Sequence, residues 1–134
     1  MKKIISINKK INHFKKNSIY VDGDKSLSIR FVLLSSLSQG KCIAINLLRS
    51  DDVMSIINCI KKLGIKIKLN KKKCEVVGKG LFGYKFKNDL ILNAGNSGTA
   101  ARLLCSVLTN KNNWVKITGD HSLKKRDMKR IITP

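Results

Sequence analysis

The feature that most constrains the fold is a repeated order of strand and helix patterns. The patterns run in the order strand, helix, strand, helix, strand, strand, with the first strand within residues 4–20 and the others in a first repeat of about residues 21–85. From about residue 88 the same order begins again, and it stops at Pro134 before the last two strands. Such self-similarity indicates one supersecondary unit used twice. We therefore predict an α/β fold of the α+β type, with one complete βαβαββ unit and a second unit cut short.

The boundaries of the expected elements follow from apolar spacing and from residues that begin or end helices. Residues 26–38 have helical spacing, and Gly40 fits the position just after a helix. Ser50 is placed as the N-cap of a second helix, which Gly64 ends. The other helices are expected at residues 99–109 and 123–132, and the strands at residues 42–47, 65–69, 74–77, 90–92 and 114–118.

The net charge of +20 is the most unusual property of the composition. A charge of this sign attracts anions, both nucleic acids and phosphorylated metabolites. The cations are nearly all lysines, and aromatic residues make up only 5% of the chain. Proteins that read nucleic acids also use arginine forks or aromatic stacking platforms. The composition therefore favours small anionic ligands, and a basic nucleic-acid-binding module stays open as an alternative.

The cysteines are scattered, with no Cys-x-x-Cys pair and no histidine pair near them, so no metal site is predicted. Free thiols in a reducing compartment are the simpler expectation. No apolar stretch has the length of a membrane span, and the basic N-terminus lacks the apolar region of a secretory signal. The predicted location is therefore the cytoplasm. The cysteines are Cys42, Cys59, Cys74 and Cys105.

A first polar loop, residues 22–26, lies between a predicted strand and a predicted helix. Backbone N–H groups at such a helix start suit an anion. Lys25 adds a full charge, Ser26 a hydroxyl donor, and Arg30 projects from nearly the same helix face as Ser26. These residues predict a phosphate or carboxylate site, although a capped helix with solvated cations explains them equally well. A nucleotide P-loop is excluded, because Asp24 rather than glycine precedes Lys25.

A second loop, residues 93–102, repeats this order. Gly98 has no Cβ and lets a ligand approach the backbone, and Asn96 adds an amide beside it. Arg102 takes the place in this helix that Arg30 has in the first one. The loop therefore predicts a second anion contact, and an ordinary glycine-rich turn before a capped helix is the alternative.

A third segment, residues 118–128, leads into the last predicted helix. Arg126 offers a bidentate fork to a carboxylate or a phosphate. Asp127 follows it directly and offers a local ion pair. Taken alone, the segment is explained more simply as a basic, solvated run.

At these three places the sequence resembles the 5-enolpyruvylshikimate-3-phosphate synthases. Residues 23–30, Gly-Asp-Lys-Ser-Leu-Ser-Ile-Arg, are similar to the first signature of that family. Residues 92–104, with Gly-Asn-Ser-Gly-Thr, resemble the second signature, and residues 118–128 resemble the third. The resemblance runs from about Tyr20 to the last residue. The Lys-Ser pair at residues 25–26 differs from the Lys-Asn of the sister family, the UDP-N-acetylglucosamine enolpyruvyl transferases.

The resemblance implies the inverse α/β barrel of the enolpyruvyl transferases, in which two globules of repeated βαβαββ units close on the substrates. It implies transfer of the enolpyruvyl group of phosphoenolpyruvate to the 5-hydroxyl of shikimate 3-phosphate with release of phosphate. This reaction belongs to the shikimate pathway, which leads to chorismate and the aromatic amino acids. No metal or organic cofactor is implied. The implied site residues are Lys25, Ser26 and Arg30 for shikimate 3-phosphate, and Lys25, Asn96, Gly98 and Arg126 for phosphoenolpyruvate.

The resemblance also implies that the chain is an N-terminal fragment. Residues 1–20 are expected to form strands of the other globule, and residues 21–134 the first part of the enolpyruvyl transferase domain. The acid/base carboxylate is expected beyond residue 134, so the fragment alone is expected to be inactive. The expected partners are the two small-molecule substrates, without nucleic acid or membrane, and the full-length enzyme is expected to be a monomer. A stand-alone anion-binding module and a basic nucleic-acid-binding module remain the alternatives.

Overall fold

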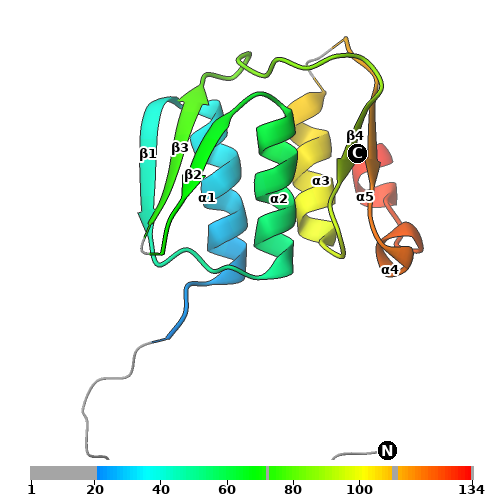
Figure 1. The fold of residues 1–134 in the computed structure, drawn as a ribbon. Helices are drawn as coiled ribbons and strands as arrows, with labels where there is room; N and C mark the ends of the chain where they lie inside the picture. The colour runs from blue at the N-terminus through cyan, green and yellow to red at the C-terminus, as the bar shows by residue number, and fades with distance from the viewer. Residues whose placement is uncertain (1–20, 72, 110–111, 134) are drawn as a thin grey trace, which may run out of the picture.

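The computed structural model describes residues 21–71, 73–109 and 112–133 (Figure 1). The strands expected within residues 1–20 lie outside the described residues. In the described part, helices and strands alternate in the predicted order, and the mixed α/β class is confirmed. The elements are α1 (Lys25–Leu37), β1 (Gln39–Ile45), α2 (Asp51–Lys62), β2 (Lys66–Leu69), β3 (Lys73–Lys79), β4 (Leu90–Asn93), α3 (Gly98–Leu108), β5 (Val115–Thr118), α4 (His121–Lys124) and α5 (Lys129–Ile132).

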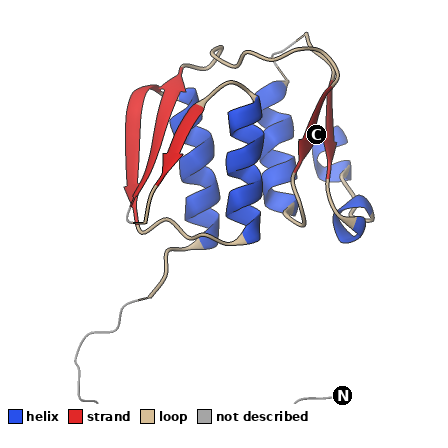
Figure 2. Ribbon diagram, viewed as in Figure 1, coloured by secondary structure: helices blue, strands red, loops and turns tan. Residues whose placement is uncertain are grey.

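The elements form layers, with a row of helices between two sheets (Figure 2). The first sheet has the order β1-β3-β2, and β3 is antiparallel to both neighbours. The second sheet pairs β4 with β5 in parallel. The helices α1, α2 and α3 lie side by side between these sheets, and all three begin at the same end of the molecule, the lower end in Figure 1. Three helix N-termini therefore point the same way.

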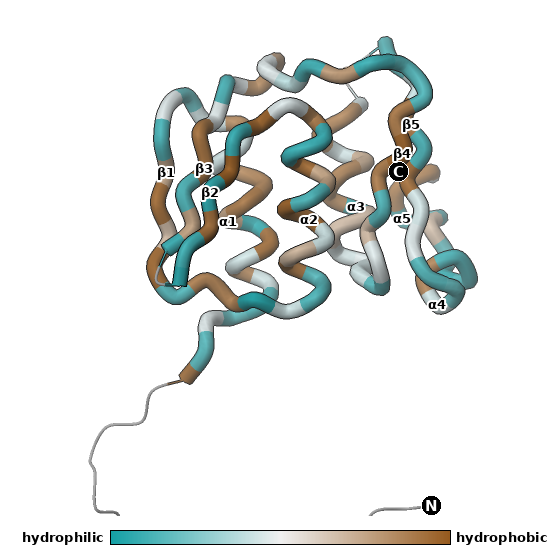
Figure 3. Tube along the Cα trace, in the orientation of Figure 1, coloured by the Kyte–Doolittle hydropathy of each residue, from teal (hydrophilic) through white to brown (hydrophobic). Residues whose placement is uncertain are grey.

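The core surrounds the helices and extends from the first sheet to β4 of the second, where Leu92 is fully buried. Helix α2 is amphipathic, and its residues Val53, Ile56, Ile57 and Ile60 are all fully buried. In β2, Ile67 faces this core, while the lysines on either side of it are exposed. Figure 3 shows the result as apolar segments facing inward and hydrophilic segments on the surface. The predicted apolar face of α2 is confirmed, and Gly64, with φ of 87°, follows its last turn.

One predicted helix end differs from the sequence pattern, and one predicted helix start is confirmed but lacks its capping hydrogen bond. Gly40 does not end α1, because the helix stops at Leu37 and the N–H of Ser38 donates to the carbonyl of Leu34 at 3.1 Å. Gly40 instead lies in β1, opposite Gly78, with φ of 95°. Ser50 does stand at the N-cap of α2, but its hydroxyl makes no capping hydrogen bond.

The single helix predicted for residues 123–132 is also wrong. The structure has two short helices, α4 and α5, separated by an irregular segment. The N–H of Arg126 donates to Leu123 three residues back, a tight last turn. The carboxylate of Asp127 then accepts from the N–H of Lys129 at 2.7 Å, which competes with helix continuation. In the described part of the chain, none of the helices combines the length and apolarity needed to cross a membrane.

Candidate functional site

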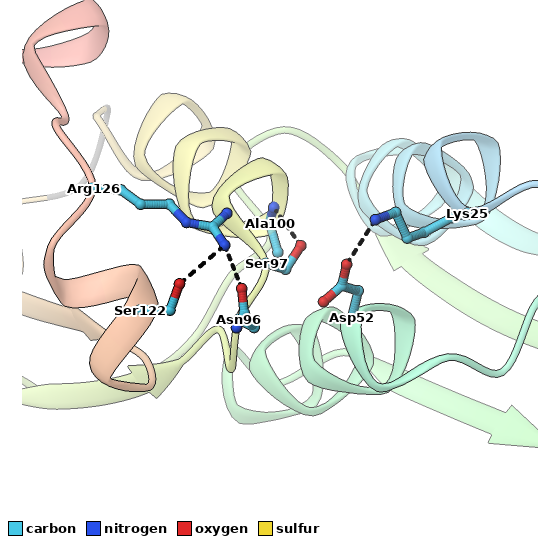
Figure 4. A network of polar contacts seen from close by, with 7 residues as sticks. All are labelled: Lys25, Asp52, Asn96, Ser97, Ala100, Ser122 and Arg126. Atoms are coloured by element: carbon cyan, nitrogen blue, oxygen red, sulfur yellow. Dashed lines mark hydrogen bonds and ion pairs between the residues drawn. The ribbon is translucent and has the colours of Figure 1, made fainter. Parts of the chain in front are cut away.

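The start of α3 forms the centre of the candidate site. Ser97 is its N-cap: the backbone is extended there, and Oγ accepts from the N–H of Ala100 at 3.2 Å (Figure 4). Ser97 is only 2% exposed, so the cap is held inside the protein. Gly98 is the first helical residue and is itself buried. The first N–H groups of a helix lack partners within it and carry partial positive charge, which favours an anion here.

Two guanidinium groups border the space that a side chain at Gly98 would take. A methyl group added to Gly98 would lie 3.1 Å from Nη1 of Arg126 and 3.3 Å from Nη1 of Arg102. Arg102 comes from α3 itself, and Arg126 comes from the segment after α4. Nε of Arg102 is buried and has no hydrogen-bond partner among the described residues. Two forked cations therefore converge on one helix N-terminus.

Arg126 is also fixed from its far side. Its Nη2 donates to Oδ1 of Asn96, and more weakly, at 3.5 Å, to Oγ of Ser122 (Figure 4). The local ion pair that Asp127 offers does not form among the described residues, since the Asp127 carboxylate binds the N–H of Lys129. The structure thus brings together three of the predicted residues, Asn96, Gly98 and Arg126.

Lys25 lies at the start of α1 and points toward the start of α2. Asp24 caps α1 by accepting from the N–H of Leu27 at 2.7 Å. Nζ of Lys25 lies 3.0 Å from Oδ2 of Asp52, and Figure 4 shows this pair beside the start of α3. The Lys25 side chain is 54% exposed, so the ion pair contributes little to stability. The ion pair instead fixes the position of the side chain, because it holds the ammonium group of Lys25 at the end of the molecule where the helices begin.

Ser26 and Arg30 lie on the first turns of α1, the helix that begins with Lys25. Nη1 of Arg30 lies 3.3 Å from the carbonyl oxygen of Ser26, and both residues are exposed. The structure gives no direct contact between this pair and the residues around Gly98. The predicted residues therefore lie in two groups at the same end of the helix row. One group is Asn96, Gly98 and Arg126 around the start of α3, and the other is Lys25, Ser26 and Arg30 on α1.

Several residues of this region carried no assigned role in the sequence pattern. The sequence indicated Asp52 only as an acid in the first turn of a helix, and Arg102 only as a repeat of Arg30. Asp120 had one usable signal, since a Gly-Asp pair three residues before Leu123 fits an N-cap, and its Oδ1 does accept from Leu123 N–H at 2.7 Å. The contact between Asp120 and Asn96 joins residues 24 positions apart, so no local sequence pattern predicts it.

The cysteines do not provide a nucleophile near this site. Burial raises the pKa of Cys59 to about 11, an increase that Lys62 partly offsets. Burial also raises the pKa values of Cys74 and Cys105. These thiols stay protonated at neutral pH, and protonated thiols are poor nucleophiles and metal ligands. Within the described residues, no cluster of three His, Cys, Asp or Glu residues could hold a metal ion.

Comparison with known proteins decides the family. The family model of EPSP synthase (3-phosphoshikimate 1-carboxyvinyltransferase) matches residues 10–134, which include every residue of the candidate site. The chain belongs to the EPSP synthase family. A 3-phosphoshikimate 1-carboxyvinyltransferase from Thermoanaerobacter sp. (strain X514) is 43% identical over 97% of this chain. One from Sulfurihydrogenibium sp. (strain YO3AOP1) is 44% identical over 87% of this chain.

Solved EPSP synthases also share the fold. The EPSP synthase from Acinetobacter baumannii superposes with a TM-score of 0.80 and 32% sequence identity, over 87% of this chain and 26% of that one. The match with the Thermoanaerobacter enzyme likewise covers 30% of that relative. The chain therefore spans between a quarter and a third of the length of these EPSP synthases. The candidate site described above lies within the residues that the family model matches.

Proposed function

We propose that this chain supplies part of the substrate site of a 3-phosphoshikimate 1-carboxyvinyltransferase. The proposed reaction transfers the enolpyruvyl group of phosphoenolpyruvate to the 5-hydroxyl of shikimate 3-phosphate and releases phosphate. Membership of the EPSP synthase family supports the reaction class. The observation that carries the assignment of the site is the convergence of Arg102 and Arg126 over Gly98, at the N-terminus of α3.

Phosphoenolpyruvate is proposed to bind at the start of α3. It carries a phosphate and a carboxylate, and both are planar or forked acceptors that match guanidinium donors. Arg126 uses one Nη2 hydrogen on Asn96 and keeps Nη1 directed at Gly98. Gly98 leaves room for an oxygen atom close to the backbone. Lys25 is proposed to reach the same ligand, and this requires it to leave or share Asp52.

Shikimate 3-phosphate is proposed to bind at the first turns of α1. Lys25, Ser26 and Arg30 supply an ammonium, a hydroxyl and a guanidinium along this helix start. The bond between Arg30 and the Ser26 carbonyl uses one donor of five, so the guanidinium retains donors for a phosphate. Lys25 stands between the two proposed ligand positions and would interact with both.

The chemistry needs charge stabilisation and proton transfer. The 5-hydroxyl loses its proton as its oxygen bonds to C2 of phosphoenolpyruvate, and a proton adds to the methylene carbon, giving a tetrahedral intermediate. The bond from C2 to the phosphate oxygen then breaks, a proton leaves the methyl group, and the double bond is restored. Fixed cations stabilise the anionic groups throughout. The proton-transfer carboxylate is proposed to lie outside these 134 residues, because Asp52 pairs with Lys25 and Asp120 accepts two hydrogen bonds.

The finer properties of the enzyme follow as proposals. Its partners are proposed to be the two small-molecule substrates, without nucleic acid or membrane and without a metal or organic cofactor. It is proposed to act as a monomer in the cytoplasm. The high positive charge then serves to attract two phosphorylated substrates to one site.

Calorimetric titration of the full-length protein tests this assignment. Replacing Arg126 with lysine keeps the charge and removes the fork, so phosphoenolpyruvate should bind on the order of 10-fold more weakly. Arg130→Lys is the matched control, since Arg130 lies on α5 and is exposed. Equal affinities in the two variants would contradict the proposed site. A protein that ignored both substrates but bound duplex DNA with steep salt dependence would instead favour the nucleic-acid alternative.

A further inference from the structure

Asp120 joins the two loops that carry the residues of the candidate site. Its Oδ1 accepts from the N–H of Leu123 at 2.7 Å and caps α4. Its Oδ2 accepts from Nδ2 of Asn96, also at 2.7 Å. Its own N–H donates to the carbonyl of Gly95 at 2.9 Å. One residue therefore fixes the loop before α3 by backbone and side chain and starts the segment that carries Arg126.

The chemistry of the partners determines how the Asn96 amide is oriented. An ionised carboxylate only accepts hydrogen bonds, and a guanidinium only donates them. Asn96 lies between Asp120 on one side and Arg126 on the other. Its amide can satisfy both only with Nδ2 toward Asp120 and Oδ1 toward Arg126, which is the orientation observed. Asp120 therefore excludes the flipped amide, which would turn two donors toward Arg126.

We infer that Asp120 is a positioning residue for phosphoenolpyruvate binding, acting through Asn96 on the guanidinium of Arg126. The inference rests on the proposed function. With Oδ1 of Asn96 holding Nη2, Nη1 of Arg126 is directed at Gly98 and at the start of α3. Asp120 touches no substrate in this arrangement, because its two carboxylate oxygens are occupied by Asn96 and Leu123.

Replacement of Asp120 with serine separates this role from helix capping. Serine caps helices as well as aspartate does. In this protein Ser97 caps α3 by accepting from a backbone N–H three residues on, the same span as from Asp120 to Leu123. A serine at position 120 keeps that bond and removes the second oxygen, which holds Asn96. We expect the phosphoenolpyruvate dissociation constant to rise on the order of 10-fold, as for loss of a charge-assisted hydrogen bond.

Asp127→Ser is the matched control for charge. Asp127 is adjacent to Arg126, and in the described part of the chain its carboxylate accepts from the N–H of Lys129. The substitution removes the same charge from the same segment without touching Asn96. Its effect on the affinity for phosphoenolpyruvate should stay within about 2-fold, since surface substitutions of this kind have small effects.

A second ligand distinguishes positioning from a structural role. Shikimate 3-phosphate is assigned to Lys25, Ser26 and Arg30, so Asp120→Ser should leave its affinity within about 2-fold. An unchanged phosphoenolpyruvate affinity would overturn the inference, and so would an equal loss for both ligands or an equal loss in Asp127→Ser. If Asp120→Ser does not fold, Asp120→Asn replaces it. This isosteric variant offers one carbonyl oxygen to two donors and must show the same selective loss.

Inorganic phosphate separates failure of the inference from failure of the proposed function. A wild-type protein that binds phosphate but neither substrate would contradict the function. The phosphate affinities of Asp120→Ser and Asp127→Ser would then decide the inference by the same comparison. A wild-type protein that binds none of the three ligands would overturn both.

Discussion

Gly98 has no side chain, and the ends of two arginines border the space that a side chain would take. The residue is not a glycine for the sake of its backbone, since its φ is not positive. Gly95, three residues earlier, does adopt a positive φ of 61°. Glycine is therefore needed at the two positions for different reasons: at Gly95 for the backbone conformation, and at Gly98 for the space beside the backbone. A substitution of Gly98 tests the second reason.

Gly98→Ala should change ligand selectivity without lowering stability. The methyl group would meet only the flexible ends of Arg102 and Arg126, which shift by a few tenths of an ångström. Alanine also favours helix over glycine, so the melting temperature should not fall. A bulkier phosphonate competitor such as glyphosate should lose more affinity than phosphoenolpyruvate. Inhibition constants for the two proteins check this, and an equal loss for both ligands would refute the steric argument.

Lys25→Ala removes the cation that stands between the two proposed ligand positions. We expect kcat/KM of the full-length enzyme to fall on the order of 100-fold or more, because the charge faces anions in a closed site. Lys66→Ala is the control, since Lys66 is exposed on β2. Steady-state kinetics with both substrates measure the effect. Near-normal kinetics for Lys25→Ala would show that Lys25 is only a surface lysine paired with Asp52.

At the scale of elements, α1 is held to the segment after β3 by one buried polar contact. Oγ of Ser36 donates to the carbonyl of Leu33 at 2.5 Å, so the hydroxyl of Tyr84 donates to Ser36 at 2.7 Å. Ser36 is fully buried and Tyr84 is 4% exposed. Burial raises the pKa of Tyr84.

Tyr84→Phe should lower the free energy of unfolding by about 1 kcal/mol at neutral pH, the net value of one hydrogen bond. Because the folded pKa is raised, the contribution of Tyr84 is fully present below the unfolded pKa of about 10. It is lost as the pH rises through the folded pKa. The stability difference between the two proteins should therefore shrink above about pH 10. Urea unfolding at pH 8 and above pH 10 measures it, and a difference that grows with pH would contradict this.

At the scale of the whole molecule, the three long helices begin at one end, and the candidate residues gather there (Figures 1 and 4). The dipoles of parallel helices add to the charge of Lys25, Arg102 and Arg126 at that end. The proposed anion site thus lies at the helix ends, while the core lies along the helices between the two sheets. Catalysis needs placed acids and bases in addition to this charge.

A polypeptide of these 134 residues alone should show no turnover. Among the described carboxylates near the site, Asp52 is paired with Lys25 and Asp120 with two donors, so neither is placed for proton transfer. The related EPSP synthases are about three times longer, since the match covers 30% of the Thermoanaerobacter enzyme. Phosphate release from phosphoenolpyruvate in the presence of shikimate 3-phosphate is the assay. Turnover within about 10-fold of ordinary enzyme rates would refute this prediction.

The local sequence pattern alone predicted the long helices, because their positions depend on residues close together in the chain. The apolar side chains Val53, Ile56, Ile57 and Ile60 recur at helical spacing, so α2 was predictable within a residue. The openings of α1 and α3 were predictable too, because capping and glycine placement depend on neighbours in sequence. The family resemblance rested on these same loops, and the match over residues 10–134 confirms it.

Tertiary structure alone decided what happens between segments. Gly40 lies in a strand because β1 pairs with β3 there, and the segment after α4 brings Arg126 to Asn96, 30 residues away in the chain. The orientation of the Asn96 amide depends on Asp120 and Arg126, which lie 24 and 30 residues away. A side-chain hydrogen bond requires atoms within about 3 Å, and only the packing of β4 against β5 brings these loops that close. Sequence spacing thus identified most of the residues of the site, and packing determined which of them touch.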